Sequence, residues 1–266
     1  MTTRRYTHGL YAEHPVPAPL AAEVACVWTR RASPGATGGH RVLPDGCVDV
    51  LFRFGAEPAA LIVGTMTEAI DVTATTDAFV GIRFRPGRAA SFLGRLASLT
   101  AAELTDRDVD LAEAWGADGA RTWARLAEAT DERRRVALAA EAVAAWFAPR
   151  VDPLVTGAID AIEAAGGAVT IDALAARAGV SRQHLARRFT ALVGVSPKVF
   201  ARVVRLRRAT AALAAAPVVD LATVAAEAGY ADQAHMNRDF RALAGTTPAR
   251  FHSSKTPAGP RGIPGA

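Results

Sequence analysis

Cysteine, histidine and aromatic residues are scarce in this sequence. Two cysteines, Cys26 and Cys47, occur in 266 residues, too few for a disulfide scaffold or a four-cysteine zinc site. Residues 41–183 contain no histidine, so the central part of the chain cannot build a histidine metal site. Aromatic residues make up 6% of a chain that is 50% hydrophobic. This balance is typical of a folded protein in which small apolar residues pack helices closely.

Long uncharged apolar runs and catalytic motifs are also absent. The sequence has no run of 18 apolar residues free of charge and no apolar segment among the first twenty residues. We therefore expect no membrane span, no signal peptide and a cytoplasmic protein. No glycine-rich phosphate loop and no nucleophile–base–acid set can be found. We therefore expect no catalytic residue, no metal and no cofactor.

Acidic residues are missing from one long stretch. Residues 181–208 hold eight basic residues and no acidic one. Residues 152–266 carry 14 Lys and Arg against 8 Asp and Glu, whereas residues 1–151 carry 17 against 18. A solvated helix face explains an isolated charge run, but a run that excludes acids over several helical turns is typical of a surface that contacts phosphates.

Short alternating segments predict strands in the first hundred residues. Val24, Cys26 and Trp28 alternate with other residues, and further strands are predicted near 48–52, 61–63, 69–74 and 78–85. Pro44-Asp45-Gly46 predicts a turn, since proline presets φ and glycine accepts a positive φ. Residues 1–20, with three prolines, are expected to be irregular, and the glycine-rich segment 33–40 to form a loop. These strands predict a small barrel or sandwich.

A helical period follows the strands. Helices are predicted at 88–96, 118–129 and 131–147, the last capped by Asp131. Pro149 and Pro153 indicate a boundary near residue 150, after which residues 154–252 have the pattern of helices only.

The C-terminal part contains a repeat. Residues 174–200 (LAARAGVSRQHLARRFTALVGVSPKVF) match residues 224–251 (VAAEAGYADQAHMNRDFRALAGTTPARF). Ala178-Gly179 aligns with Ala228-Gly229 at an offset of 50. At an offset of 51 the aligned pairs are Phe189/Phe240, Leu192/Leu243, Gly194/Gly245, Pro197/Pro248 and Phe200/Phe251.

Each repeat has the pattern of a helix-turn-helix. A short helix begins at a cap, Thr170 or Asp172 in the first repeat and Asp220 in the second, and ends at the Ala-Gly pair. In the second helix of the first repeat, Ser181 is the expected cap, and residues 185, 189 and 192 fall on the core face. The remaining outward residues at the start of each second helix are polar, which is typical of a recognition helix in the major groove.

A long helix is predicted between the repeats. Ser196 caps it, Pro197 suits its first position, and it runs to about Ala215. At 1.5 Å per residue such a helix is about 27 Å long. It can hold two recognition helices roughly one DNA turn apart, since successive major grooves are about 34 Å apart.

The fold class is therefore α+β, with a small N-terminal β-rich barrel or sandwich with helices and an all-α C-terminal domain of two helix-turn-helix units joined by a long helix. We expect a β-rich sensing or oligomerisation domain at 1–98 and a helical linker region at 99–150. A double helix-turn-helix domain is expected at 151–253 and a disordered tail at 254–266.

The repeat, its Ala-Gly turns and the segment GYADQAHMNRDFRALAGTTPARF resemble the DNA-binding domain of AraC-type transcriptional regulators. The family signature has a glycine-aromatic pair, a late Phe, a Gly, and a Pro before a final aromatic residue. Here these are Gly229-Tyr230, Phe240, Gly245, Pro248 and Phe251. The resemblance covers residues 155–253, and it implies sequence-specific binding to double-stranded DNA.

The resemblance and the charge run assign roles to particular side chains. The base-reading positions are Gln183, Ala186, Arg187, Gln233, Ala234, His235 and Arg238. Phosphate contacts are expected of Ser181, Arg182, Arg188, Lys198, Arg202, Arg205 and Asn237. Gln and Arg bind adenine and guanine edges through two hydrogen bonds, whereas an alanine offers only a methyl contact to thymine.

The segments LPDGCVDVLFRFG and GIRFRPGRAASFLG resemble the β-rich region that precedes this domain in some actinobacterial AraC-type proteins. The resemblance implies that the N-terminal part senses a small-molecule effector or forms a homodimer, and that RNA polymerase is a further partner. It names no effector.

Two N-terminal groups of residues remain open at this stage. Asp45, Asp49, Arg83 and Arg85 either line a polar pocket or are charges of turns and strand edges, and we favour the second interpretation. Cys26 and Cys47 are expected to be buried structural thiols, with a redox or metal pair as the alternative.

The sequence thus predicts a bacterial, DNA-binding transcriptional regulator that is not an enzyme. One alternative is a non-specific architectural DNA-binding protein, which needs the same charge but not the Gln and Arg side chains. The other is an enzyme whose site lies in the N-terminal domain.

Overall fold

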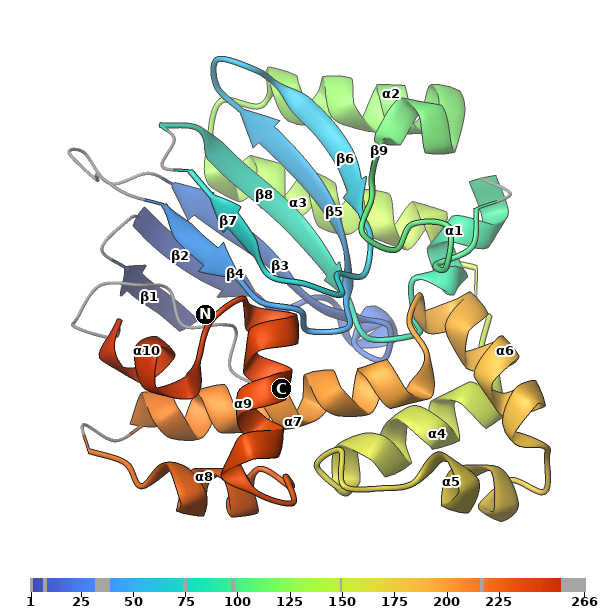
Figure 1. Cartoon of the computed structure of the whole chain (residues 1–266). Coiled ribbons are helices and arrows are strands. Elements are labelled where there is room, and N and C mark those ends of the chain that lie inside the picture. Colours follow the sequence, from blue (N-terminus) through green and yellow to red (C-terminus); the bar gives the residue numbers. More distant parts are fainter. Residues whose placement is uncertain are drawn as a thin grey trace.

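The computed structural model describes residues 2–6, 9–31, 39–73, 76–96, 99–148, 150–215 and 218–254 (Figure 1). We call the portion up to residue 148 the sheet part and the portion from residue 150 the helical part. Most of the glycine-rich segment 33–40 and the tail after Ser254 lie outside the described residues. The expected fold class is confirmed, since an antiparallel sheet region precedes a helical region.

The sheet part is built on a seven-stranded antiparallel sheet in the order β1-β2-β3-β8-β5-β6-β9, with a separate two-stranded ribbon of β4 and β7. The strands are β1 (Thr2–Tyr6), β2 (Gly9–His14), β3 (Val24–Arg31), β4 (His40–Val42), β5 (Val48–Phe54), β6 (Ala59–Val63), β7 (Ile70–Val72), β8 (Ala78–Phe84) and β9 (Asp108–Asp110). A short 3-10 helix, Ala18–Leu20, lies between β2 and β3.

The prediction of an irregular segment at residues 1–20 was wrong. Two strands occupy most of it, because β2 pairs with residues 27–31 of β3 through backbone hydrogen bonds that need no side-chain alternation. Tyr11 also stacks on Trp28, with ring centroids 6.0 Å apart. The three prolines lie just after β2 and therefore do not interrupt it.

Alternation along the strands gives the sheet two different faces. In β5, Val48, Val50 and Phe52 are buried in the main core, whereas Asp49, Leu51 and Arg53 line a cavity on the opposite face. The same alternation occurs in β8, where Ile82 is buried in the core and Arg83 faces the cavity. One face therefore supports the fold, and the other face is free for a site.

Helices cover the core face of the sheet. They are α1 (Ala90–Leu96), α2 (Leu111–Glu128) and α3 (Glu132–Trp146), and Figure 1 shows α2 and α3 behind the sheet. Leu126 of α2 and Leu138 of α3 belong to the same core as the strands. The segment expected as a helical linker region thus completes the core of the sheet part.

Helix α2 begins earlier than the sequence indicated. Asp110 caps it by accepting hydrogen bonds from the backbone N–H groups of Ala112 and Glu113. Gly116 has a non-helical backbone (φ 52°, ψ −136°) inside it, which breaks the apolar period and hid the first turn. Asp131 caps α3 as expected, by accepting from the N–H of Arg134.

The helical part consists of α4 (Pro153–Ala164), α5 (Ile171–Arg177), α6 (Arg182–Val193), α7 (Pro197–Ala215), α8 (Leu221–Glu227), α9 (Gln233–Ala244) and α10 (Pro248–Ser253). Thr170, Ser181 and Asp220 cap α5, α6 and α8 as predicted. Asp232 caps α9 by accepting from the N–H of His235, a cap that the sequence analysis did not identify. The expected long helix between the repeats is α7, with the predicted ends.

Helix α3 provides a test of the shared core. Leu138 is 3% exposed there, and Leu138→Ala is expected to lower the free energy of unfolding by about 2–5 kcal/mol, because it leaves a cavity against the sheet. Arg133→Ala, on the exposed side of the same helix, should change it by less than about 0.5 kcal/mol. Urea unfolding followed by circular dichroism measures both, and equal effects would contradict the placement of α3 in the core.

Candidate functional site

Of the two expected recognition helices, α6 lies at the amino-terminal end of α7 and α9 crosses the middle of α7, where Asp239 pairs with Arg202 and Arg205. Figure 1 shows both helices running from the lower face of the molecule, where α5 and α8 precede them, up toward the sheet part. Their amino-terminal turns therefore point away from the sheet, and their carboxyl-terminal ends point toward it. Each helix-turn-helix has its own core, and α7 contributes to both.

The predicted base-reading residues of α6 lie at its free end. Gln183 and Arg187 are exposed and Ala186 is half-buried, whereas Leu185 and Phe189 are buried on the opposite side of the helix. Arg182 pairs with Asp172 at 3.2 Å, and Arg188 pairs with Asp152 at 2.6 Å. The side chains of Arg182, Gln183, Arg187 and Arg188 are thus all exposed on α6.

The predicted residues of α9 are less uniform. Gln233, Ala234 and Arg238 are exposed, whereas His235 and Asn237 are half-buried. The His235 ring meets the Tyr230 ring edge-on, with centroids 5.2 Å apart, and its Nδ1 accepts a hydrogen bond from the N–H of Ala231. His235 therefore helps to hold the turn before α9, in addition to lying at a predicted reading position.

Two of the predicted phosphate contacts are engaged inside the helical part. Arg202 donates from Nε to Asp239 at 2.8 Å. Arg205 lies 3.6 Å from the same carboxylate, donates to the carbonyl of Gly167 and covers the Tyr230 ring. The side chains of Arg205 and Asp239 are only 13% and 6% exposed. Arg205 joins α7 to α9, and only Lys198 of the three predicted α7 contacts is exposed.

A cavity of about 460 Å³ opens between the sheet, the β4–β7 ribbon and α7. Its walls are mostly apolar, and they include Trp28, Leu51 and Phe79 from the sheet and Val72 from the ribbon. Leu206, Arg207 and Thr210 of α7 complete it, so both parts of the chain form the cavity. This volume is within the range of small-molecule sites.

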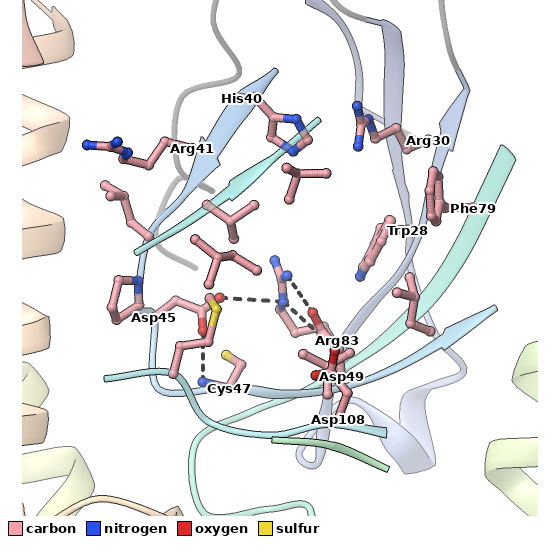
Figure 2. A pocket seen from close by; sticks show the side chains of 18 of the residues that line it. Trp28, Arg30, His40, Arg41, Asp45, Cys47, Asp49, Phe79, Arg83 and Asp108 are labelled. Carbon is pink, nitrogen blue, oxygen red and sulfur yellow. Dashed lines mark hydrogen bonds and ion pairs between the residues drawn. The ribbon is translucent and has the colours of Figure 1, made fainter. Parts of the chain in front are cut away.

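A charged cluster forms the floor of this cavity, with Arg83 projecting into it between two carboxylates (Figure 2). Arg83 donates to both oxygens of Asp49, at 3.1 Å from Nε and 2.7 Å from Nη2, and its Nε lies 3.6 Å from Asp45. Burial alone would lower the pKa of Arg83, but the two carboxylates outweigh burial and raise it. The polar-pocket interpretation is thus the one that the geometry supports for these three residues, whereas Arg85 lies outside and donates to the carbonyl of Ala21.

Both cysteines are free thiols near this floor. Burial raises the pKa of Cys26 to about 12, and burial together with Asp45 raises the pKa of Cys47. A thiol with a raised pKa is protonated at neutral pH and is a poor nucleophile or metal ligand. Cys26 is buried as expected, whereas Cys47 is half-buried and lines the cavity.

The sheet part also contacts the carboxyl-terminal end of each recognition helix. Thr65 Oγ1 donates to the carbonyl of Val193 at 2.8 Å, and Thr105 Oγ1 donates to the carbonyl of Gly194 at 2.7 Å. At the end of α9, Arg41 Nη1 donates to the carbonyls of Ala244 and Gly245, at 3.1 and 3.3 Å. These side chains satisfy carbonyls that have no partner within the helix.

The sequence analysis did not identify Arg41, Thr65 or Thr105. Their partners lie 203, 128 and 89 residues away in the chain, so no local pattern points to them. The glycine at position 46 was one local signal of a close contact between the two parts, and its φ is 82°. A Cβ atom there would lie 2.6 Å from the Phe200 ring, so the turn packs directly on α7.

Within the described ranges, no three His, Cys, Asp or Glu side chains converge as a metal site. No described helix combines the length and the apolar character needed to cross a membrane.

Two family models match the chain, one within the helical part and one within the sheet part. A model described as "Helix-turn-helix domain" matches residues 174–254, and a model described as "Domain of unknown function (DUF6597)" matches residues 12–110. No curated protein sequence matches the chain.

Solved structures are similar to parts of the chain. The DNA-binding domain of AdpA, solved with a target DNA, is 28% identical over 39% of this chain and 93% of that chain, with a TM-score of 0.36. A probable AraC family transcriptional regulator from Rhodopseudomonas palustris is 29% identical over 40% of this chain and 100% of that chain, with a TM-score of 0.35. ToxT from Vibrio cholerae is 8% identical over 83% of this chain and 96% of that chain, with a TM-score of 0.44.

The family match to residues 174–254 falls on the repeat that carries the AraC-type signature. The same residues fold into two helix-turn-helix units that share α7. The carboxyl-terminal residues 174–254 are therefore a helix-turn-helix domain of the AraC type.

Proposed function

We propose that α6 and α9 enter successive major grooves on one side of a DNA duplex and read its sequence. The observation that carries this proposal is the orientation of the two helices, whose amino-terminal turns point the same way, from the amino-terminal end of α7 for α6 and from its middle for α9 (Figure 1). With 19 residues, α7 is about 28 Å long, close to the roughly 34 Å between successive major grooves.

Exposure separates the proposed base-reading residues. Gln183 and Arg187 of α6, and Gln233 and Arg238 of α9, are exposed and can form two hydrogen bonds to adenine or guanine edges. Ala186 and Ala234 can offer only a methyl contact. His235 is half-buried and lies edge-on against Tyr230 at its proposed reading position.

The proposed phosphate contacts are a smaller set than the charge run indicated. Ser181, Arg182, Arg188, Lys198 and Asn237 remain in it. Arg202 and Arg205 are assigned instead to the internal cluster around Asp239, because their guanidinium groups are engaged there.

The remaining parts of the proposal concern regulation. The cavity between the sheet part and α7 is the proposed effector site, and residue 150 is the proposed boundary between a sensing domain and the DNA-binding domain. Self-association, contact with RNA polymerase and a cytoplasmic location are further parts that rest on the family resemblance.

Selection from a random DNA pool by the full chain tests this function. A sequence-specific regulator is expected to enrich an asymmetric site with two contact blocks and to bind it about 1,000-fold or more tightly than random DNA. Uniform binding with a steep salt dependence would instead support a non-specific architectural protein.

Arg187→Ala is expected to weaken binding to the selected site by about 1–3 kcal/mol and to relax the base preference at one position. The reason is that the variant loses hydrogen bonds to one base edge only. Arg125→Ala removes another exposed charge, on α2 of the sheet part, and serves as the control. Fluorescence anisotropy measures binding to DNA sites that each differ from the selected site at one position. If Arg187→Ala weakened binding to all of these DNA sites equally, the base-reading role of Arg187 would be contradicted.

Lys198→Ala and Arg205→Ala are expected to change different properties: DNA binding in the first variant and the free energy of unfolding in the second. Lys198→Ala should weaken all DNA sequences alike and lower the slope of log K against log salt by about 1, since one phosphate contact is lost. Arg205→Ala should leave that slope unchanged and lower the free energy of unfolding by about 1.5–3 kcal/mol, because charged hydrogen bonds are lost. Salt titrations and urea unfolding of both variants distinguish these roles, and a lower slope in a stable Arg205→Ala protein would restore Arg205 to the DNA contacts.

A further inference from the structure

The floor of the cavity holds a hydrogen-bond donor that the protein does not use. Arg83 Nη1 is buried and has no hydrogen-bond partner among the described residues, although the other guanidinium nitrogens bond Asp49. The side chain is 9% exposed, and Figure 2 shows its end directed into the cavity. A buried donor without a partner is costly, so this atom favours a ligand that supplies an acceptor.

The charges around Arg83 restrict the kind of acceptor. Two carboxylates, of Asp45 and Asp49, already face this single guanidinium. A ligand carboxylate placed on Nη1 would become the third anion beside one cation, and like charges at such distances are strongly unfavourable. A ligand ammonium group cannot accept a hydrogen bond and would face the guanidinium.

The walls restrict the rest of the ligand. Above the floor the cavity is lined by side chains such as Trp28, Leu51, Val63 and Val72, and contact with these walls favours an apolar body. At the opposite end Arg30 lies over the Phe79 ring, 5.6 Å from its centroid. Burial lowers the pKa of Arg30, so this second cation is also partly desolvated.

We propose that the cavity binds a mainly apolar molecule whose buried end is uncharged and accepts a hydrogen bond from Arg83 Nη1, as a ketone, ester or amide does. This inference deepens the proposed effector site by giving the chemical class of its ligand. It does not depend on DNA binding.

Three probes with equal chain length test the class: methyl octyl ketone, decanoate and decylammonium. Isothermal titration calorimetry on the full chain is expected to give a dissociation constant for the ketone about tenfold or more below those of the two charged probes. Arg30 and Arg53 are the cations that line the far end of the cavity. The double variant Arg30→Gln/Arg53→Gln removes both, and the preference for the ketone should persist there. Leu51→Trp fills the cavity from the sheet side and should abolish the heat of ketone binding in a protein with unchanged circular dichroism.

The outcomes separate the inference from the proposed function. Decanoate binding as tightly as the ketone in the Arg30→Gln/Arg53→Gln protein would overturn the uncharged class, and so would tighter binding of decylammonium. Failure of all three probes would overturn it as well, while DNA selection by the same protein would leave the DNA-binding function standing.

A different observation carries a second inference, which concerns the carboxyl-terminal ends of the recognition helices. Arg41 reaches the end of α9 from the β4–β7 ribbon. Its guanidinium group binds two partners, because Nε and Nη2 donate to Asp71 of β7 at 2.8 and 2.7 Å, while Nη1 donates to the end of α9. Thr65 and Thr105 reach the end of α6 from the segments next to β6 and β9. A cation and hydroxyl donors at helix carboxyl ends are stabilising, since the carbonyls there are unpaired and partly negative.

We infer that these contacts hold α6 and α9 at a fixed separation. Val42, Ile70 and Val72 of the ribbon line the cavity, so a ligand in the cavity touches the same two strands that carry Arg41 and Asp71. The inference rests on the proposed reading of DNA by both helices.

Spacing between the two contact blocks of the selected site tests this inference. Wild-type protein is expected to lose affinity when one base pair is inserted between the blocks, and Arg41→Ala should reduce that loss by about fivefold or more. Arg31→Ala removes an exposed arginine paired with Glu132, far from α9, and should behave like wild type. An unchanged spacing preference in folded Arg41→Ala protein would overturn the inference, whereas loss of all specific binding by wild type at the original spacing would instead contradict the proposed function.

Discussion

Helix α7 is the element on which the rest of the structure depends, because it packs into both helix-turn-helix cores and against the sheet part. Phe200 and Val204 enter the core of the first helix-turn-helix, and Leu206 and Leu213 enter the core of the second. Leu206, Arg207 and Thr210 also form a wall of the cavity in the sheet part. A helix packed on three neighbours cannot shift against one of them without disturbing the others. The two recognition helices and the cavity are therefore mechanically connected through one rigid element.

Besides its contacts with α7, the sheet part contacts the carboxyl-terminal ends of α6 and α9, which are the ends opposite to the proposed base-reading residues. The carboxyl-terminal ends of α6 and α9 are held by Thr65, Thr105 and Arg41, while their amino-terminal turns remain exposed on the far side. This arrangement lets the sheet part influence the position of each helix without covering the residues proposed to read bases. It also gives the β4–β7 ribbon two roles, since it closes the cavity and carries Arg41.

Much of the helical part could be predicted from the sequence, because its signals are local. The caps Ser181 and Asp220, the Ala-Gly turns and the apolar spacing each lie within one or two helical turns of the structure they specify. The strands β1 and β2 could not be predicted, since their pairing with β3 depends on backbone contacts across the sheet. Arg205 shows a further limit: a basic run predicts charge on a helix, but only packing decides that Arg205 is engaged with Asp239 while Lys198 is exposed.

The central claim is that two helices of one chain read successive major grooves. Guanine methylation interference on the selected DNA site tests it most directly, because a methyl group on guanine N7 blocks a major-groove contact at one base. Two blocks of interference are expected about 10 base pairs apart on one face of the duplex, and the variant Arg238→Ala should change only one of them, because arginine is the side chain that binds guanine N7 and O6. A single block, or two blocks that both change in that variant, would contradict this claim.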